Sequence, residues 1–208
     1  MRIDSLKTAP DRAGRYWVTF SDGSKLGLYR QTVEDFGLYT GMELSDYEFE
    51  KLKTAAGQMS AKMRTVRIVS ASSVSKRDLE ERLVKKGEDP DQAKEAVQWM
   101  EDLHLVNDRN TAEQVVHSCI SKGYGLQRAK QALYEKRIPK EYWAEALADY
   151  PDQSEKIESF LRSRLDADSD DKEVKKAVDA LLRRGHSYGT IRRVLNDLSF
   201  DTEDYFED

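Results

Sequence analysis

Few side chains of this protein have the type and spacing that catalysis needs. His117 and Cys119 could supply a base and a nucleophile, but residues two positions apart on a helix point to different faces. The segment Lys122-Gly123-Tyr124-Gly125 contains glycines, yet no strand pattern precedes it and no Lys-Ser or Lys-Thr pair follows it. A turn between helices is therefore favoured over a phosphate-binding loop. The six acids between residues 88 and 102 have no second acidic cluster to act with, which indicates a solvated helix face. We expect a protein that is not an enzyme.

The sequence also predicts no cofactor, no metal site and no internal disulfide. Cys119 is the single cysteine, and the three histidines have no spacing that suits structural zinc. No stretch approaches the roughly 18 consecutive apolar residues of a spanning helix. The first residues, MRIDSLKTAPDRAG, lack the apolar run of a secretory signal. We expect a cytoplasmic protein that does not enter a membrane.

The charged residues are unevenly distributed. The 208 residues include 34 Lys and Arg against 39 Asp and Glu, a formal net charge of −5, which excludes a uniformly basic nucleic-acid-binding surface. Residues 62–86 nevertheless hold eight basic side chains against three acidic ones, and residues 172–193 hold seven against two. Residues 196–208 hold six acids and no base. Local basic surfaces that could bind a polyanion therefore remain.

Alternating apolar residues near the amino terminus predict a small β-hairpin cap. In residues 15–20 every second residue is apolar, Asp22-Gly23 supplies a tight turn, and the alternation resumes after it. Ile3 and Leu6 predict a third strand, because an isolated hairpin is only marginally stable in water. We place this cap at residues 1–45.

One long amphipathic helix is predicted to follow the cap. It begins at Ser45 or Asp46, either of which is a good N-cap, and continues to about Ser70. Its apolar residues recur every three or four positions and predict a single stripe along the helix, made of Phe49, Leu52, Ala56, Met59, Met63 and Val66.

The rest of the sequence contains an internal repeat. Gly87, Arg137 and Gly185 become equivalent when three short turns are superposed, at separations of 50 and 48 residues. Positions eight and four residues before the turn residue, and six and ten after it, are apolar in all three copies: Leu79, Leu83, Ala93, Val97, Ala129, Leu133, Trp143, Leu147, Ala177, Leu181, Ile191 and Leu195. One helix therefore runs into each turn and another leaves it, and the two glycines are expected to end their helices.

These patterns predict a mainly α fold, in which tandem three-helix repeats form an elongated, curved array with a small N-terminal β-hairpin cap. The predicted repeats span 46–106, 107–150 and 151–199, and an acidic tail spans 200–208. After the long helix, the predicted helices span 75–86, 91–103, 108–122, 126–136, 140–148, 154–165, 172–184 and 187–198.

Basic pairs recur near the repeated turns. Cations at a helix C-terminus complement the helix dipole by a few tenths to about 1 kcal/mol, which explains each pair alone. The helix dipole does not explain why the basic pairs repeat at a spacing that would align them along a curved array. There they could follow a regularly spaced polyanion or an acidic filament. The residues predicted to contact such a filament or DNA are Lys85, Lys86, Arg128, Lys130, Lys136, Arg137, Arg183, Arg184, Arg192 and Arg193.

Several short segments, in an order and spacing that cover nearly the whole chain, carry a family resemblance. They are Gly41-Met42-Glu43-Leu44, Ser75-Lys76-Arg77-Asp78-Leu79, Leu105-Val106-Asn107-Asp108, Lys122-Gly123-Tyr124-Gly125, Lys136-Arg137-Ile138 and Arg184-Gly185-His186-Ser187-Tyr188. Together they resemble the RecX family, modulators of the RecA recombinase. Three positions depart from the usual pattern: Thr111 stands where an aromatic residue is common, Arg137 where a glycine commonly ends the helix, and Leu105 where a tyrosine is frequent.

The resemblance implies a non-enzymatic, negative regulator of RecA, with a place in homologous recombination, DNA repair and the SOS response. Such a protein lodges in the groove of a RecA filament on single-stranded DNA and inhibits recombinase, ATPase and coprotease activities. Its partner is the RecA nucleoprotein filament, direct contact with single- or double-stranded DNA stays open, and a monomer is expected. The alternatives are a stand-alone helix-turn-helix DNA-binding protein and a scaffold for some other protein.

Overall fold

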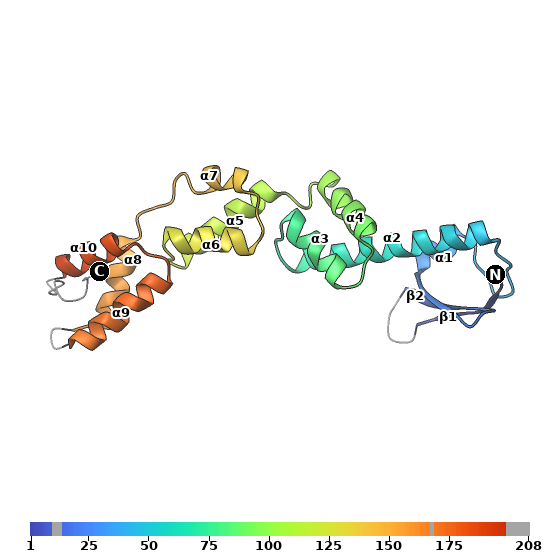
Figure 1. Ribbon diagram of the computed structural model, residues 1–208, viewed down its shortest axis with the longest axis horizontal. Coiled ribbons are helices and arrows are strands. Elements are labelled where there is room, and N and C mark those ends of the chain that lie inside the picture. The colour runs from blue at the N-terminus through green and yellow to red at the C-terminus, as the bar shows by residue number, and fades with distance from the viewer. Residues whose placement is uncertain (10–13, 167–168, 199–208) are drawn as a thin grey trace. The chain divides into compact units, whose positions relative to one another are not determined.

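The computed structural model describes residues 1–9, 14–166 and 169–198, and this part of the chain is mainly helical with one small antiparallel sheet (Figure 1). The chain forms two compact units, Met1–Val106 and Asn107–Asp208. The predicted fold class is confirmed, whereas the boundaries of the individual repeats and the curvature of their array stay predictions. The predicted acidic tail, 200–208, lies outside the described residues. Within the described residues no helix is long and apolar enough to cross a membrane.

The first unit opens with the predicted hairpin and its third strand. The turn after the second strand needs a left-handed backbone, which Gly23 adopts with φ +82°. Val18 and Leu28 are fully buried on one face of the sheet, in a cluster that includes Leu52 of the long helix. The antiparallel strands lie in the order β1-β2-β3, with bounds β1 Ile3–Thr8, β2 Arg15–Phe20 and β3 Lys25–Tyr29.

Four helices complete the first unit: α1 Arg30–Asp35, α2 Asp46–Ala71, α3 Lys76–Lys85 and α4 Pro90–Asp102. Ser45 caps α2, as predicted. The Ser45 hydroxyl accepts a hydrogen bond from the Glu48 amide at 3.2 Å, and the Glu48 carboxylate accepts one from the Ser45 amide at 2.8 Å. This reciprocal pair satisfies two backbone donors that the first helical turn leaves unpaired.

The apolar stripe of α2 is not continuous, and this part of the prediction was wrong. Leu52 and Ala56 are buried, but Met59 and Met63 are only half-buried, and full burial resumes at Ala61. The buried face shifts because α2 changes partner along its length. Its first half packs against the sheet, and its second half packs against α3 and α4 in a three-helix bundle.

The second unit contains two successive helical groups with separate apolar clusters. One cluster joins Val116 to Leu133 and Ile138, and the other joins Ile157 to Leu181. The elements are α5 Asp108–Ser121, α6 Leu126–Glu135, the 3-10 turn η1 Lys140–Tyr142, α7 Trp143–Ala146, α8 Ser154–Arg162, α9 Asp171–Arg183 and α10 Tyr188–Asp197.

The single helix predicted over 140–148 was wrong, since η1 and the four-residue α7 replace it. After α7 the Ala148 and Tyr150 amides donate to carbonyls three residues back, which tightens the chain into short turns. Pro151 then follows, and a proline disfavours helical backbone at the residue before it. The segment therefore becomes a short connection to α8.

The three superposed turns have the same geometry in the structure. Gly87, Arg137 and Gly185 all have a left-handed backbone, with φ of +88°, +55° and +82°. At each turn the amide of this residue donates to the carbonyl three residues back, and the next amide donates to the carbonyl five residues back. Of the twelve apolar repeat positions ten are buried, and Trp143 and Leu147 are half-buried. The register read from the sequence therefore holds.

Candidate filament and nucleic-acid interface

Six of the ten predicted contact cations lie at the carboxyl ends of α3, α6 and α9, the second helices of the three predicted repeats. They extend the helix or follow it, where the last carbonyls carry a partial negative charge. Five of the six are exposed, and Lys136 is half-buried. The pairs are Lys85 and Lys86 at the end of α3, Lys136 and Arg137 directly after α6, and Arg183 and Arg184 at the end of α9.

Internal ion pairs neutralise much of the basic stretch 62–86. Lys85 and Lys86, by contrast, form no ion pair with any described residue. The positive charge that this unit offers a ligand is therefore smaller than the sequence count suggests. The two lysines at the turn after α3 remain available to a ligand. The ion pairs are Arg64–Glu88 at 2.7 Å, Lys76–Glu101 at 2.6 Å, Arg77–Glu81 at 3.2 Å and Arg82–Asp78 at 2.8 Å.

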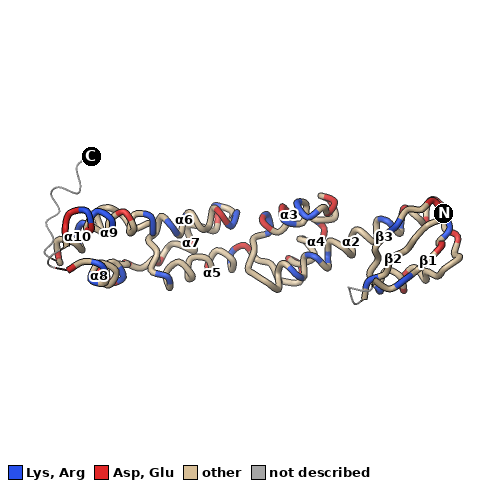
Figure 2. Tube along the Cα trace, turned by 90° about the horizontal axis from the view of Figure 1, so that it is seen from below, with Lys and Arg blue, Asp and Glu red and all other residues tan. Residues whose placement is uncertain are grey.

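Two predicted contact residues of the second unit are also paired with carboxylates. Arg128 on α6 lies 3.0 Å from Glu135, and its hydrogen bond lowers the pKa of that carboxyl. Arg193 on α10 lies 3.1 Å from Asp152. Arg192 is exposed on α10. In the described part of the chain no ion pair engages Lys130, Arg183 or Arg184. Figure 2 shows cationic segments along α8 and α9.

The structure brings Arg128 against the turn that carries Arg183 and Arg184. The Gly125 amide donates to the Arg184 carbonyl at 2.9 Å, and the Gln127 amide donates to the Gly185 carbonyl at 3.2 Å. A Cβ atom at Gly185 would lie 2.2 Å from the Arg128 amide nitrogen, so only glycine allows this approach. We call this backbone contact between the α5–α6 turn and the α9–α10 turn the junction.

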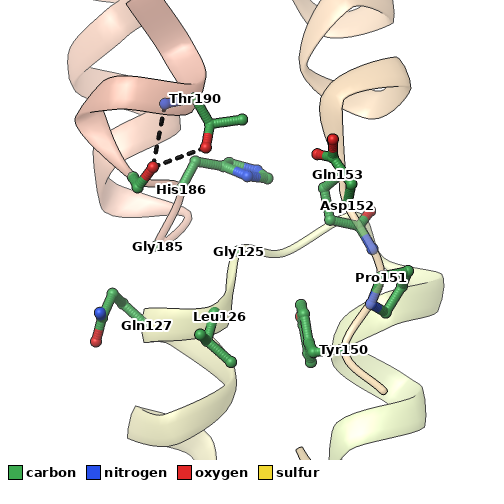
Figure 3. A pocket seen from close by; sticks show the side chains of 11 residues that line it. Gly125, Leu126, Gln127, Tyr150, Pro151, Asp152, Gln153, Gly185, His186 and Thr190 are labelled. Carbon is green, nitrogen blue, oxygen red and sulfur yellow. Dashed lines mark hydrogen bonds between the residues drawn. The ribbon is translucent and has the colours of Figure 1, made fainter. Parts of the chain in front are cut away.

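Two side chains reinforce the junction. The buried His186 ring donates from Nε2 to the Gly123 carbonyl at 3.0 Å, and burial lowers the pKa of His186, so that the neutral ring is favoured. The Tyr150 hydroxyl donates to the Tyr124 carbonyl at 2.7 Å, and burial raises the pKa of Tyr150 to about 12. A pocket of about 380 Å³ lies beside the junction, with the His186 ring directed toward the segment that carries Gln153 (Figure 3).

Two residues near the α9–α10 turn, Phe160 and Arg164, were not among the predicted contact residues. Phe160 on α8 contacts the guanidinium groups of both Arg164 and Arg184. Spacing along the chain could have placed Phe160 and Arg164 one helical turn apart, four residues from each other. No local signal adds Arg184, because it comes from the next helix.

The residues considered for catalysis do not come together. Cys119 is buried, and burial raises the pKa of its thiol, whereas His117 is exposed on the same helix. A neutral buried thiol is a poor nucleophile. The segment Lys122-Gly123-Tyr124-Gly125 is a turn between α5 and α6, as predicted. Among the described residues no group of three or more His, Cys, Asp or Glu side chains is placed to hold a metal ion.

Comparisons with known proteins agree on one family. Residues 107–147 match the model of "RecX, second three-helix domain". The chain is 27% identical to "Regulatory protein RecX" of Oceanobacillus iheyensis, over 98% of this chain and 77% of that protein. It is 30% identical to "Regulatory protein RecX" of Xanthomonas axonopodis pv. citri, over 62% of this chain and 80% of that protein.

Solved structures show the same fold. The crystal structure of a regulatory protein RecX superposes with a TM-score of 0.61 at 20% identity, over 94% of this chain and 98% of that one. RecX from Lactobacillus salivarius superposes with a TM-score of 0.60 at 24% identity, over 70% of this chain and 98% of that one. Sequence and fold lead to the same assignment: the chain belongs to the RecX family of regulatory proteins.

Proposed function

We propose that this protein is a negative regulator of RecA that binds in the groove of the RecA filament on single-stranded DNA. There it lowers the recombinase, ATPase and coprotease activities of the filament. Membership of the RecX family supports the partner. The observation that carries the proposal is the exposed cations at equivalent turns: Lys85 and Lys86 in the first unit and Arg183 and Arg184 in the second, none of which pairs with a described carboxylate.

The repeated turn gives this proposal its physical basis. A filament presents the same acidic surface, and the same stretch of DNA backbone, at regular intervals. A protein that carries the same cationic turn in successive repeats can bind several of these intervals at once. Linked contacts raise the overall affinity well above that of one contact, so inhibition is expected at substoichiometric amounts.

The remaining parts of the proposal concern how the protein works. As a regulatory protein of the RecX family, it acts by binding and performs no chemistry of its own. It needs no cofactor, acts as a monomer, and meets the filament in the cytoplasm.

The third helices of the first two repeats disfavour the stand-alone helix-turn-helix alternative. Such a protein inserts a recognition helix into the major groove, and that helix would follow the repeated turn. In the first repeat this helix is α4, which carries four acids and one lysine and would repel phosphates. In the second repeat it is α7, which has four residues and is too short to fill a groove.

Titration of the purified protein into RecA on single-stranded DNA tests the proposal. The rate of ATP hydrolysis should fall with less than one molecule of this protein per RecA subunit. An unchanged rate at equimolar protein would contradict it. A gel shift without RecA tests the helix-turn-helix alternative. Tight, sequence-selective binding to duplex DNA with a steep salt dependence would favour that alternative.

A further inference from the structure

Phe160 holds two arginines of the second unit close together. The guanidinium carbons of Arg164 and Arg184 each lie 4.7 Å from the centre of the Phe160 ring. The two cations are therefore no more than twice that distance apart. Guanidinium groups favour such stacking on an aromatic face, and it leaves their N–H edges free to donate. We call these three residues the arginine clamp.

The backbone holds the arginine clamp in place. Phe160 packs against the apolar core of α8, α9 and α10. The carbonyl of Arg184 accepts the junction hydrogen bond from the Gly125 amide, and the Arg164 amide donates to the Leu161 carbonyl at 2.9 Å. Since the ring and both backbones are fixed, a ligand that binds these guanidinium groups orders little that was mobile, which favours affinity.

Within the described residues, no carboxylate neutralises either charge of the clamp. Arg164 and Arg184 are both exposed, and neither forms an ion pair with a described residue. The carboxylate of Glu158, on the same helix as Phe160, lies 2.8 Å from Arg162 and is already engaged. Two positive charges no more than twice 4.7 Å apart repel each other, and an anionic chain that contacts both replaces that repulsion with two attractions. The clamp is therefore suited to an anionic ligand.

We propose that the arginine clamp binds single-stranded nucleic acid, with the two guanidinium groups on backbone phosphates. Phosphate oxygens match the fork of N–H donors on arginine. Exposed guanidinium groups can also stack on unpaired bases, a contact that the carboxylates of an acidic protein surface cannot make. Arg183, the exposed sequence neighbour of Arg184, extends the attraction to a further phosphate. This inference deepens the proposed function, on which it rests for the identity of the strand as filament DNA.

Fluorescence anisotropy with a labelled thymidine oligonucleotide, in the absence of RecA, tests the site. We expect the unmodified protein to bind, and the double variant Arg164→Gln with Arg184→Gln to bind at least about tenfold more weakly. The slope of log affinity against log salt should decrease by about 1.4 in magnitude, because each phosphate contact on a single strand contributes about 0.7. The matched control Arg162→Gln with Lys172→Gln removes the same charge from α8 and α9, and it should leave this slope unchanged.

The variant Phe160→Leu tests whether binding depends on the arrangement of the clamp and not only on the net charge of the protein. Leucine keeps an apolar contact with the core but removes the aromatic platform, so affinity should fall about threefold or more at unchanged formal charge. Thermal unfolding by circular dichroism checks that each variant is folded. The site is overturned if the unmodified protein does not bind the oligonucleotide, or if the double variant and its control bind with equal affinity and slope.

The same variants in the RecA ATPase assay distinguish the two proposals. Normal oligonucleotide binding by Arg164→Gln with Arg184→Gln, together with lost ATPase inhibition, would assign the clamp to an acidic protein surface and overturn the nucleic-acid site. An ATPase rate that the unmodified protein leaves unchanged would overturn the proposed function. In that case, weakened oligonucleotide binding by the double variant would still support the site.

Discussion

At the scale of single residues, a comparison of Gly87 with Gly185 distinguishes two costs of replacing a glycine: the strain of a left-handed backbone and the crowding of a Cβ atom. Both are left-handed and end equivalent helices. A Cβ atom at Gly87 would meet no atom within 4 Å, whereas one at Gly185 would lie 2.2 Å from the Arg128 amide nitrogen. The left-handed backbone costs a non-glycine residue about 1–2 kcal/mol, and overpacking adds about 1–3 kcal/mol.

We therefore expect Gly87→Ala to lower the free energy of unfolding of its unit by about 1 kcal/mol, and Gly185→Ala to lower that of its own unit by about 3 kcal/mol. Native-state hydrogen exchange, which resolves the two units, measures both losses. Equal losses for the two variants would show that the junction yields to a methyl group and does not hold the turns in contact.

His186 makes the stability of the second unit depend on pH. Burial lowers the pKa of His186 below its ordinary 6.5, and the charge of Arg184 acts in the same direction. The unfolded chain therefore binds the proton more readily than the folded chain does. The stability that neutral His186 contributes is present above the unfolded pKa and is lost as the pH falls through the folded one.

Urea unfolding of the second unit at several values between about pH 7.5 and about pH 5 should show this loss. The variant His186→Gln should show a smaller decrease in the free energy of unfolding over the same range. His117→Gln, at an exposed histidine of the same unit, is the matched control and should keep the full decrease. Identical pH profiles for all three proteins would rule out this role of His186.

At the scale of elements, Glu88 ties α2 to the turn between α3 and α4. Its buried carboxylate accepts a hydrogen bond from the Ser60 hydroxyl at 3.0 Å and forms an ion pair with Arg64 at 2.7 Å. Arg64 also donates to the Lys86 carbonyl at 2.6 Å. Helix α2 also carries an exposed ion pair, Lys53 with Glu50 at 3.0 Å, which provides a control.

Glu88→Ala should lower the free energy of unfolding of the first unit by about 2–3 kcal/mol, below the usual 3–5 for a broken buried pair because Arg64 keeps some access to water. Glu50→Ala should cost less than about 1 kcal/mol, as exposed pairs do. Urea denaturation compares the two variants. A loss at Glu88 no larger than the loss at Glu50 would mean that the tie contributes nothing to the bundle.

The elements also show which features the sequence could predict. The hairpin, the helix ends and the repeated turn follow from spacing, caps and turn residues, which act over a few positions. The change of buried face along α2 and the loss of a third helix after Pro139 depend on what each segment packs against. Periodicity carries no information about a packing partner, so these features were missed.

The candidate site has the same limit. Its cations were found because basic pairs at helix ends are a local pattern. Their ion pairs could not be predicted in this way, because partners such as Arg193 and Asp152 are 41 residues apart and meet only in the folded unit. The arginine clamp was missed for the same reason, since Phe160 and Arg184 come from different helices.

At the scale of the whole molecule, the charge that is available to a ligand depends on which cations stay unpaired after folding. The chain as a whole is acidic, and ion pairs consume part of its basic stretches. The equivalent turns after α3 and α9 keep exposed cations that no described carboxylate engages. We propose that these cations bind this RecX family protein to the RecA filament.

The most direct measurement is RecA ATPase inhibition by the quadruple variant in which Lys85, Lys86, Arg183 and Arg184 are replaced by glutamate. The concentration for half-inhibition should rise at least about tenfold, because each change removes an attraction and adds a repulsion. Its control replaces four other exposed lysines, Lys25, Lys51, Lys172 and Lys175, with glutamate and should inhibit like the unmodified protein within about threefold. Full inhibition by the first variant, or equal weakening in both, would contradict the account.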